Sequence, residues 1–270
     1  MATQTNPSVE SELKFWLSIT RRLPRVKGAG RIGHTVKRLY NRRKRQDATV
    51  DVLDFKMVLD PSENIEGQLL FCPQLYDWVE IECLRKRLKP GNTFLDAGAN
   101  VGFYSLIAAQ LVGDAGTVIA VEADPNNGAR LATNIKVSGA KNVRLANVGL
   151  SDKTEVLELG LNTTGNRSGH SFLSDSTAKV KVQCKTLTDV LLSEGVQKLD
   201  GAKMDIEGFE FKVLQRFFAD GNSKLWPGFL IIEVNPSFGE KNTRDILSLL
   251  KQNGYALDNL SELNYLAVRK

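Results

Sequence analysis

The chain has 270 residues, 36 lysines and arginines, 31 aspartates and glutamates, and a formal net charge of +5. Residues 1–50 hold 12 basic and three acidic residues, a charge of +9, whereas residues 51–270 hold 24 basic and 28 acidic residues, a charge of −4. The basic character therefore belongs to the N-terminal segment, which weakens an assignment of the whole chain to the nucleic-acid-binding proteins. Because no apolar run approaches the ~20 residues that a membrane-spanning helix needs, we expect no transmembrane segment and no signal peptide.

The cysteines and histidines are few and scattered. Cys72, Cys83 and Cys184 lack the close spacing of metal ligands, and His34 and His170 are the two histidines. We therefore expect buried, reduced thiols, a cytoplasmic protein and no structural zinc site.

The N-terminal segment divides into a helical part and a basic part. Residues 8–23 place Leu13, Trp16 and Leu17 at helical spacing, which predicts an amphipathic helix. Residues 25–46 are interpreted as a solvated arm or linker. The alternatives are a peripheral contact of residues 8–45 with an anionic membrane, or a contact with RNA. We therefore separate a basic N-terminal extension, residues 1–49, from a second domain, residues 50–270.

In the second domain, strand and helix patterns alternate along the chain. A strand-like segment at 50–59 and a helix at 73–88 come first. The helices that follow are expected at 101–111, at 127–138, around Val213 to Phe218, and from a capping Thr243 onward. The strands are expected at 93–96, 117–122, 143–148, 202–204, 229–233, 255–257 and 265–268.

This alternation predicts an α/β fold with a doubly wound, mostly parallel, seven-stranded sheet. The last two short strands follow each other closely, which predicts an antiparallel C-terminal edge. Ligands of such sheets bind beyond the carboxyl ends of the strands, so the residues at those ends are the candidate site.

The first strand ends in Asp96, followed by Gly98, Asn100 and Gly102. The glycines allow a tight turn and a close approach of the backbone to a ligand, and the following helix offers free N–H groups. An aspartate here would repel a pyrophosphate but would suit an ammonium group. This combination fits S-adenosylmethionine better than NAD, and the dinucleotide fingerprint G-x-G-x-x-G is absent.

The next two strands supply further candidate contacts with the cofactor. Glu122 ends the second strand, 24 residues after Gly98, where a carboxylate can accept hydrogen bonds from ribose hydroxyls; this spacing alone does not exclude NAD. Ser151 and Asp152 follow the third strand, where they would lie beside an adenine or form a plain turn.

The fourth and fifth strands end in acidic residues. Asp205 and Glu207 follow the fourth strand, and Glu233 ends the fifth. We expect these three carboxylates to converge around the acceptor of the reaction, with Asp205 where donor and acceptor meet. Carboxylates also suit a helix start and can bind metals, but we predict no metal here.

Three motifs, in this order and spacing, resemble the FkbM family of S-adenosylmethionine-dependent methyltransferases. They are Asp-Ala-Gly-Ala-Asn-Val-Gly at 96–102, Val-Glu-Ala-Asp-Pro at 121–125 and Lys-Met-Asp-Ile-Glu-Gly-Phe-Glu at 203–210. Residues 182–192 are also similar to the family, and the resemblance extends over residues 50–270. Ala123 and the pair at 188–189 depart from the usual pattern, which leaves the cofactor assignment intact.

The resemblance implies a class I methyltransferase fold and, as the function, O-methylation of a sugar, a glycan or another small molecule. Asp205 is then the first candidate for the base that removes the hydroxyl proton, or it orients the donor. His170, in a loop at 162–175, is the second candidate. The alternatives are a methyltransferase for RNA or protein that docks through the basic arm, and a dehydrogenase-like nucleotide binder.

Overall fold

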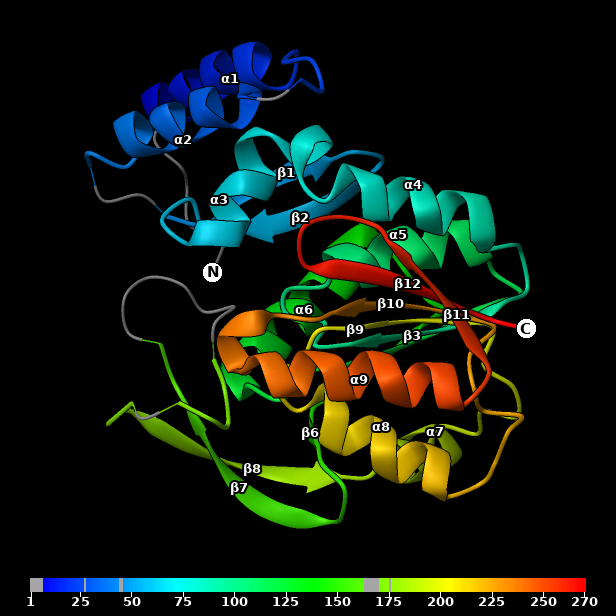
Figure 1. Cartoon of the computed structure of the whole chain (residues 1–270). Helices are drawn as coiled ribbons and strands as arrows, with labels where there is room; N and C mark the ends of the chain where they lie inside the picture. Colours follow the sequence, from blue (N-terminus) through cyan, green and yellow to red (C-terminus); the bar gives the residue numbers. More distant parts are fainter. Residues whose placement is uncertain (1–6, 27, 44–45, 163–169, 175) are drawn as a thin grey trace. The chain divides into compact units, whose positions relative to one another are not determined.

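The computed structural model describes residues 7–270 except 27, 44, 45, 163–169 and 175 (Figure 1). The described residues form two compact units, one up to Trp78 and one from Val79. The change in charge near residue 50 does not coincide with this division, because β1 and β2 pack with α3, which packs with α1 and α2 in the first unit.

The first unit combines helices with a two-stranded hairpin. Strands β1 and β2 pair in antiparallel fashion, and Leu53 in the connecting turn has a φ of 53°. The segment 50–59 is therefore a hairpin and not one strand. The elements of this unit are α1 (Pro7–Thr20), α2 (Ala29–Tyr40), β1 (Ala48–Val52), β2 (Phe55–Leu59), α3 (Asn64–Phe71) and the short 3-10 helix η1 (Pro73–Leu75).

The prediction of a solvated arm over residues 25–46 is wrong where α2 lies. This helix buries Ala29, Gly33, Val36 and Tyr40 along one side. The ring of Tyr40 packs edge-on against Phe71, with ring centroids 5.5 Å apart. Two of the buried residues are small, so the apolar stripe is weak in the sequence although it is continuous in space.

The second unit is built on a seven-stranded sheet in the order β11-β12-β10-β9-β3-β4-β5. Strand β12 lies antiparallel between β10 and β11, and the pairs from β10 to β5 are parallel. The predicted α/β fold with a doubly wound, mostly parallel sheet is confirmed. The strands are β3 (Thr93–Ala97), β4 (Thr117–Val121), β5 (Val143–Ala146), β9 (Gly201–Met204), β10 (Phe229–Glu233), β11 (Tyr255–Asn259) and β12 (Asn264–Arg269).

Helices cover both faces of this sheet, with α4 and α5 on one face and α8 and α9 on the other (Figure 1). The helices are α4 (Trp78–Arg87), α5 (Phe103–Val112), α6 (Pro125–Ser138), α7 (Leu187–Ser193), α8 (Glu210–Ala219), α9 (Glu240–Gln252) and the short η3 (Pro236–Phe238). The predicted helix at 73–88 is divided between η1 and α4. Thr243 does not cap α9, which follows Gly239 directly. In the part of the chain that the structure describes, no helix is both long and apolar enough to cross a membrane.

A second, three-stranded sheet was not predicted. It consists of β6 (Gly149–Leu150), β8 (Lys179–Lys185) and β7 (Glu155–Gly160), in that order. Because β5 ends at Ala146, the chain leaves the large sheet and starts the small one within a few residues. Ser151 and Asp152 therefore follow β6 and not the third strand of the large sheet.

Candidate active site

Asp96 and Lys203 are the buried charged residues at the bottom of the site. They are register partners on β3 and β9, so both side chains project from the same face of the sheet. Ser105 of α5 donates a hydrogen bond of 2.6 Å to Oδ2 of Asp96. Burial raises the pKa of Asp96, while the charge of Lys203 and this hydrogen bond oppose the rise. The other oxygen, Oδ1, is buried and has no hydrogen-bond partner among the described residues.

In the turn after β3, the backbone at Gly98 lies very close to the backbone at Asp205. The amides of Gly98 and Ala99 both donate to the carbonyl of Val121, at 2.9 Å. Gly98 has a φ of +84°, and a Cβ atom there would lie 1.8 Å from the carbonyl oxygen of Asp205. Asn100 also adopts a positive φ, 49°. Glycine at position 98 is therefore required both by conformation and by space.

Glu122 holds this turn in place. Its Oε2 accepts a hydrogen bond from the amide of Asn100 at 2.7 Å, and its Oε1 accepts one from the amide of Asp124 at 2.8 Å. Burial raises the pKa of Glu122 to about 7. A carboxylate has about four acceptor positions, so each oxygen keeps capacity for a further donor such as a hydroxyl.

His170 lies against Asp124, the N-cap residue of α6. Nδ1 of His170 is 3.0 Å from Oδ2 of Asp124, and the side chains are 8% and 0% exposed. Burial would raise the pKa of Asp124, but hydrogen bonds from His170 and from the amide of Asn126 lower it below its ordinary value. The next residue, Ser171, donates to the carbonyl of Glu207 at 2.8 Å. The segment 170–171 thus connects the ends of β4 and β9. The remainder of the predicted 162–175 loop lies partly outside the described residues.

Three carboxyl groups gather at the ends of β9 and β10. Asp205 and Glu233 each come one position after the last paired residues of these parallel strands. Burial and the charges of Asp205 and Glu233 raise the pKa of Glu207 to about 8. Burial and the charge of Asp205 raise the pKa of Glu233 to about 7. The structure therefore brings together the three acidic residues that the sequence predicted for the acceptor side.

Lys203 supplies a positive charge beside these three carboxyl groups. Its ammonium group donates to Oδ2 of Asp205 at 2.9 Å and lies 4.7 Å from the centroid of the Tyr104 ring. The side chain of Lys203 is 6% exposed, whereas that of Asp205 is 28% exposed. Asp205 is thus the member of the pair that a ligand can reach.

Glu210, the first residue of α8, shapes the backbone beside these acids. Its carboxylate accepts hydrogen bonds from the amides of Ile206 at 2.8 Å and Gly208 at 3.0 Å. Burial raises its pKa to about 7. Glu210 therefore holds the turn that carries Glu207, whose own φ is 53°.

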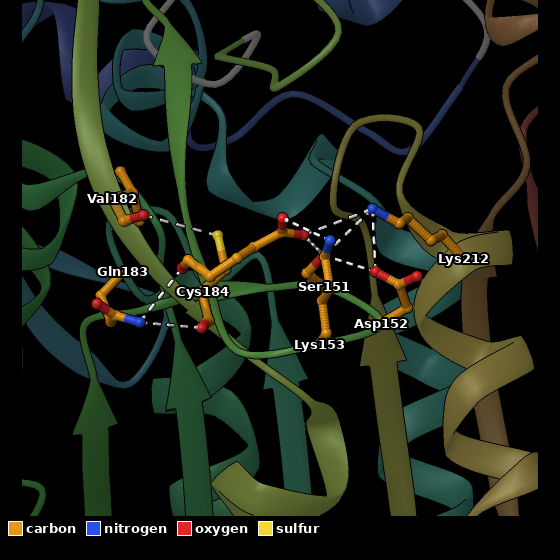
Figure 2. Close-up of polar contacts among 8 residues, drawn as sticks. Ser151, Asp152, Lys153, Val182, Gln183, Cys184 and Lys212 are labelled. Atoms are coloured by element: carbon orange, nitrogen blue, oxygen red, sulfur yellow. Dashed lines mark hydrogen bonds and ion pairs between the residues drawn. The ribbon is translucent and has the colours of Figure 1, made fainter.

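Ser151 and Asp152 lie in a polar cluster with α8 (Figure 2). Ser151 donates to Oε1 of Glu155 at 2.8 Å, and Lys212 reaches Asp152 at 3.0 Å and Glu155 at 3.7 Å. Lys153 also pairs with Glu155, at 3.5 Å. Burial alone would raise the pKa of Asp152, but Lys212 lowers it below its ordinary value. The cluster joins β6 and the start of β7 to α8.

The predicted residues thus fall into three groups. The first group is the turn after β3 with the carboxylate that holds it: Asp96, Gly98, Asn100, Gly102 and Glu122. The second is the acidic group of Asp205, Glu207 and Glu233. The third is the cluster that Ser151 and Asp152 form with Lys212. The polar partner of His170 is Asp124, two positions after Glu122. Within the described ranges, no three histidine, cysteine, aspartate or glutamate side chains are arranged to hold a metal ion.

The sequence reasoning assigned no role to Lys203, Ser105 or Lys212. A signal existed for Lys203, since it is the one charged residue in the otherwise apolar strand Gly201–Met204. Ser105 and Lys212 lie on helices whose register against the strands only the folded chain determines.

The residues that form the turn and the acidic group fall inside one family match. The methyltransferase FkbM domain matches residues 96–257, which is well over half of the chain. The chain belongs to the FkbM methyltransferase family. The predicted family is confirmed, and S-adenosylmethionine is the cofactor of this FkbM methyltransferase.

Solved structures of other methyltransferases resemble the chain at low identity. They include precorrin-6y C5,15-methyltransferase from Geobacter metallireducens, with 14% identity, a TM-score of 0.47, and coverage of 74% of this chain and 89% of that chain. A SAM-dependent methyltransferase from Aquifex aeolicus has 15% identity and a TM-score of 0.44, with coverage of 72% and 91%. No protein with a curated description matches the sequence. Similarities this low identify no acceptor.

The residues of the turn fit the cofactor. The unpartnered Oδ1 of Asp96 is a buried acceptor at the carboxyl end of β3. Gly98 and Gly102 carry no Cβ atom, and a Cβ atom on Gly102 would lie 2.3 Å from Leu131. Glu122 keeps acceptor capacity for hydroxyl groups. This set of acceptors suits a ligand with an ammonium group and a ribose.

Proposed function

We propose that this FkbM methyltransferase transfers the methyl group of S-adenosylmethionine to a hydroxyl of a sugar, a glycan or another small molecule. The observation that carries the proposal is the acidic group at the ends of β9 and β10, with Asp205 partly exposed and paired to buried Lys203. A hydroxyl donates well to carboxylates, and a neutral acceptor is not repelled by them.

In this proposal Asp96 accepts a hydrogen bond from the ammonium group of the cofactor, and Glu122 accepts from the ribose hydroxyls. Ser151 and Asp152 contact the adenine. Bound S-adenosylmethionine supplies a methyl group on a positively charged sulfur. The glycine turn fixes the geometry, since holding acceptor and methyl group in line provides much of the rate.

Asp205 is the proposed base. Its carboxylate would accept the proton of the acceptor hydroxyl as that oxygen bonds to the methyl carbon, the bond from this carbon to sulfur breaks and S-adenosylhomocysteine leaves. Glu207 and Glu233 would hold neighbouring hydroxyls of the acceptor. Lys203 supports this role, because its ammonium group donates to Oδ2 of Asp205 at 2.9 Å and so fixes the position of the carboxylate. His170 is the second candidate base, but its Nδ1 is occupied by Asp124.

The alternative acceptors, RNA and protein, receive less support. The carboxylate of Asp205 would repel the phosphate groups of an RNA acceptor. Protein acceptors carry fewer hydroxyls than sugars do, so they would use fewer of the three carboxyl groups. The three cysteines, free and buried, support a reducing compartment such as the cytoplasm.

The test is a screen with isotopically labelled S-adenosylmethionine. The acceptors offered to the full chain are neutral sugars, lipid-linked glycans, RNA and a protein mixture. We expect label on a hydroxyl of a neutral sugar or glycan. Label on RNA or protein alone would contradict the proposal, and binding of NADH but not S-adenosylhomocysteine would contradict the cofactor assignment.

A further inference from the structure

The first unit exposes a concentration of large apolar side chains. Eight such side chains are exposed among the described residues, and four of them lie between residues 15 and 32. These four are Phe15 (59% exposed), Ile19 (41%), Val26 (60%) and Ile32 (46%). Single exposed apolar residues need no explanation, but four within two adjacent helices and their connection mark an interaction surface.

The apolar side chains of α1 lie opposite its buried side. Leu13 and Thr20 are buried, whereas Phe15 and Ile19 are exposed and lie four residues apart. Residues at this spacing are neighbours on one face of a helix. The exposed stripe is therefore a second, outward apolar face of α1 and not the edge of its packed face.

The buried sides of α1 and α2 both face Cys72. The thiol of Cys72 lies 4.0 Å from the carbonyl of Thr20 on α1. On α2, a Cβ atom on Gly33 would lie 2.5 Å from the same sulfur. The two helices also pack against each other and against α3 (Figure 1). Since both buried sides face Cys72, the outer sides of α1 and α2 face away from it together.

The outer side of α2 is strongly basic. Arg31 and Arg38 are exposed and lie seven residues apart, which places them on one side of α2, and the exposed Arg42 follows just after the helix ends at Tyr40. None of the three takes part in an ion pair with a described residue, so their charges are available to a partner. Ile32, also exposed, follows Arg31 in the chain, and the amide of Arg22 donates to the carbonyl of Ile19 on α1 at 3.3 Å.

We propose that the outer face of α1 and α2, named here the α1–α2 face, binds the surface of an anionic phospholipid bilayer. The apolar side chains of this face enter the boundary between headgroups and acyl chains, and the arginines contact phosphate and carboxylate groups of the lipids. The charge of +9 over residues 1–50 complements such a surface. RNA is the less suitable partner, because three of the four exposed apolar side chains, Ile19, Val26 and Ile32, are aliphatic, and Phe15 alone offers a ring for bases to stack on.

The test is sedimentation of the full chain with phospholipid vesicles. One set of vesicles contains phosphatidylcholine and phosphatidylserine in equal parts, and the other contains phosphatidylcholine alone. We expect sedimentation with the anionic vesicles only, and release as the salt concentration rises. The replacement Phe15→Ser with Ile19→Ser is expected to lower partition about tenfold or more. The triple replacement of Arg31, Arg38 and Arg42 by Gln is expected to lower it roughly a hundredfold.

Matched control variants distinguish binding through the α1–α2 face from non-specific hydrophobic binding. Val156→Ser with Leu173→Ser removes two equally exposed apolar side chains in the second unit, and partition should stay unchanged. All replaced residues are exposed, and equal melting temperatures would establish that the variants fold. Equal binding to both kinds of vesicle, or no loss of binding in the Phe15 and Ile19 variant, would overturn the proposal. So would tight binding of a single-stranded RNA oligonucleotide at physiological salt without any vesicle binding.

Discussion

The ammonium group of Lys203 lies 2.9 Å from Oδ2 of Asp205 at the carboxyl end of β9. Lys203 is buried, and its charge also opposes the rise in the pKa of Asp96 on the neighbouring strand. One buried cation thus acts on the residue proposed to bind the cofactor and on the residue proposed to act as the base. This arrangement makes Lys203 a positioning residue for methyl transfer.

Replacing Lys203 tests this role directly. Lys203→Met removes the ammonium group that donates to Oδ2 of Asp205, so the carboxylate loses the partner that positions it. We expect kcat to fall about tenfold or more. Lys203→Arg keeps a cationic donor and should restore part of the lost kcat.

Lys198 is the matched control for Lys203. It pairs with Asp200 just before β9, and its side chain is 74% exposed. Lys198→Met should leave kcat unchanged. Full turnover in Lys203→Met, or no recovery of kcat in a folded Lys203→Arg variant, would contradict the positioning role of Lys203.

Glu122 is predicted to contribute to cofactor affinity. Glu122→Ala removes the acceptor proposed for the ribose hydroxyls and leaves the amides of Asn100 and Asp124 without their partner. The binding of S-adenosylhomocysteine, measured by titration calorimetry, should weaken by about 1–3 kcal/mol. Glu158→Ala, on an exposed position of β7, is the control. An unchanged affinity in Glu122→Ala would rule out the ribose assignment.

Gly98 and Gly91 form a natural pair for testing the turn. Both have a φ of +84°, but a Cβ atom on Gly98 would meet the carbonyl of Asp205 at 1.8 Å, whereas one on Gly91 would meet nothing within 4 Å. Gly98→Ala combines backbone strain with a clash and should lower the free energy of unfolding by about 2–5 kcal/mol. Gly91→Ala has the strain alone and should cost about 1–2 kcal/mol. Denaturant unfolding measures both, and equal losses would contradict the close approach.

Glu207 makes stability depend on pH. Its pKa is raised by burial and by Asp205, Glu233 and Glu210, against Lys203, to about 8 from 4.5. A carboxyl group with a raised pKa stabilises the fold in its neutral form, so its contribution is complete below about pH 4.5 and is lost as the pH rises through about 8.

Glu207→Gln is neutral at every pH and therefore isolates this effect. The difference in melting temperature between Glu207→Gln and the unmodified protein should shift in favour of the variant as the pH rises from about 5 to about 8. Scanning calorimetry at several pH values provides the measurement. A constant difference across this range would show that Glu207 does not titrate there.

The central sheet and its strand ends could be predicted from the sequence. Apolar strands such as Phe229–Glu233 have no competing interpretation, and Gly98 with Asp96 identifies the turn. Strand β8 was not predicted, although Val180, Val182 and Cys184 alternate with lysine and glutamine in the period of two that is typical of a strand. That signal was available in the sequence.

Other features could not be obtained from the sequence. Helix α2 buries Ala29 and Gly33, which give little apolar signal, and it follows a glycine. The contact between His170 and Asp124 joins residues 46 positions apart through a loop, and no local pattern encodes it. The cluster of Ser151, Glu155 and Lys212 likewise depends on how the small sheet meets α8.

The most direct test of the account is the turnover of Asp205→Asn on the acceptor identified with labelled S-adenosylmethionine. The variant keeps the size of the side chain but cannot accept the hydroxyl proton, so kcat should fall about a hundredfold or more. The Kd of S-adenosylhomocysteine should stay within about threefold of the original, since the turn that binds the cofactor is intact. His170→Ala should lose less than about tenfold in kcat. An Asp205→Asn variant with full turnover, or a His170→Ala variant with none, would contradict the account.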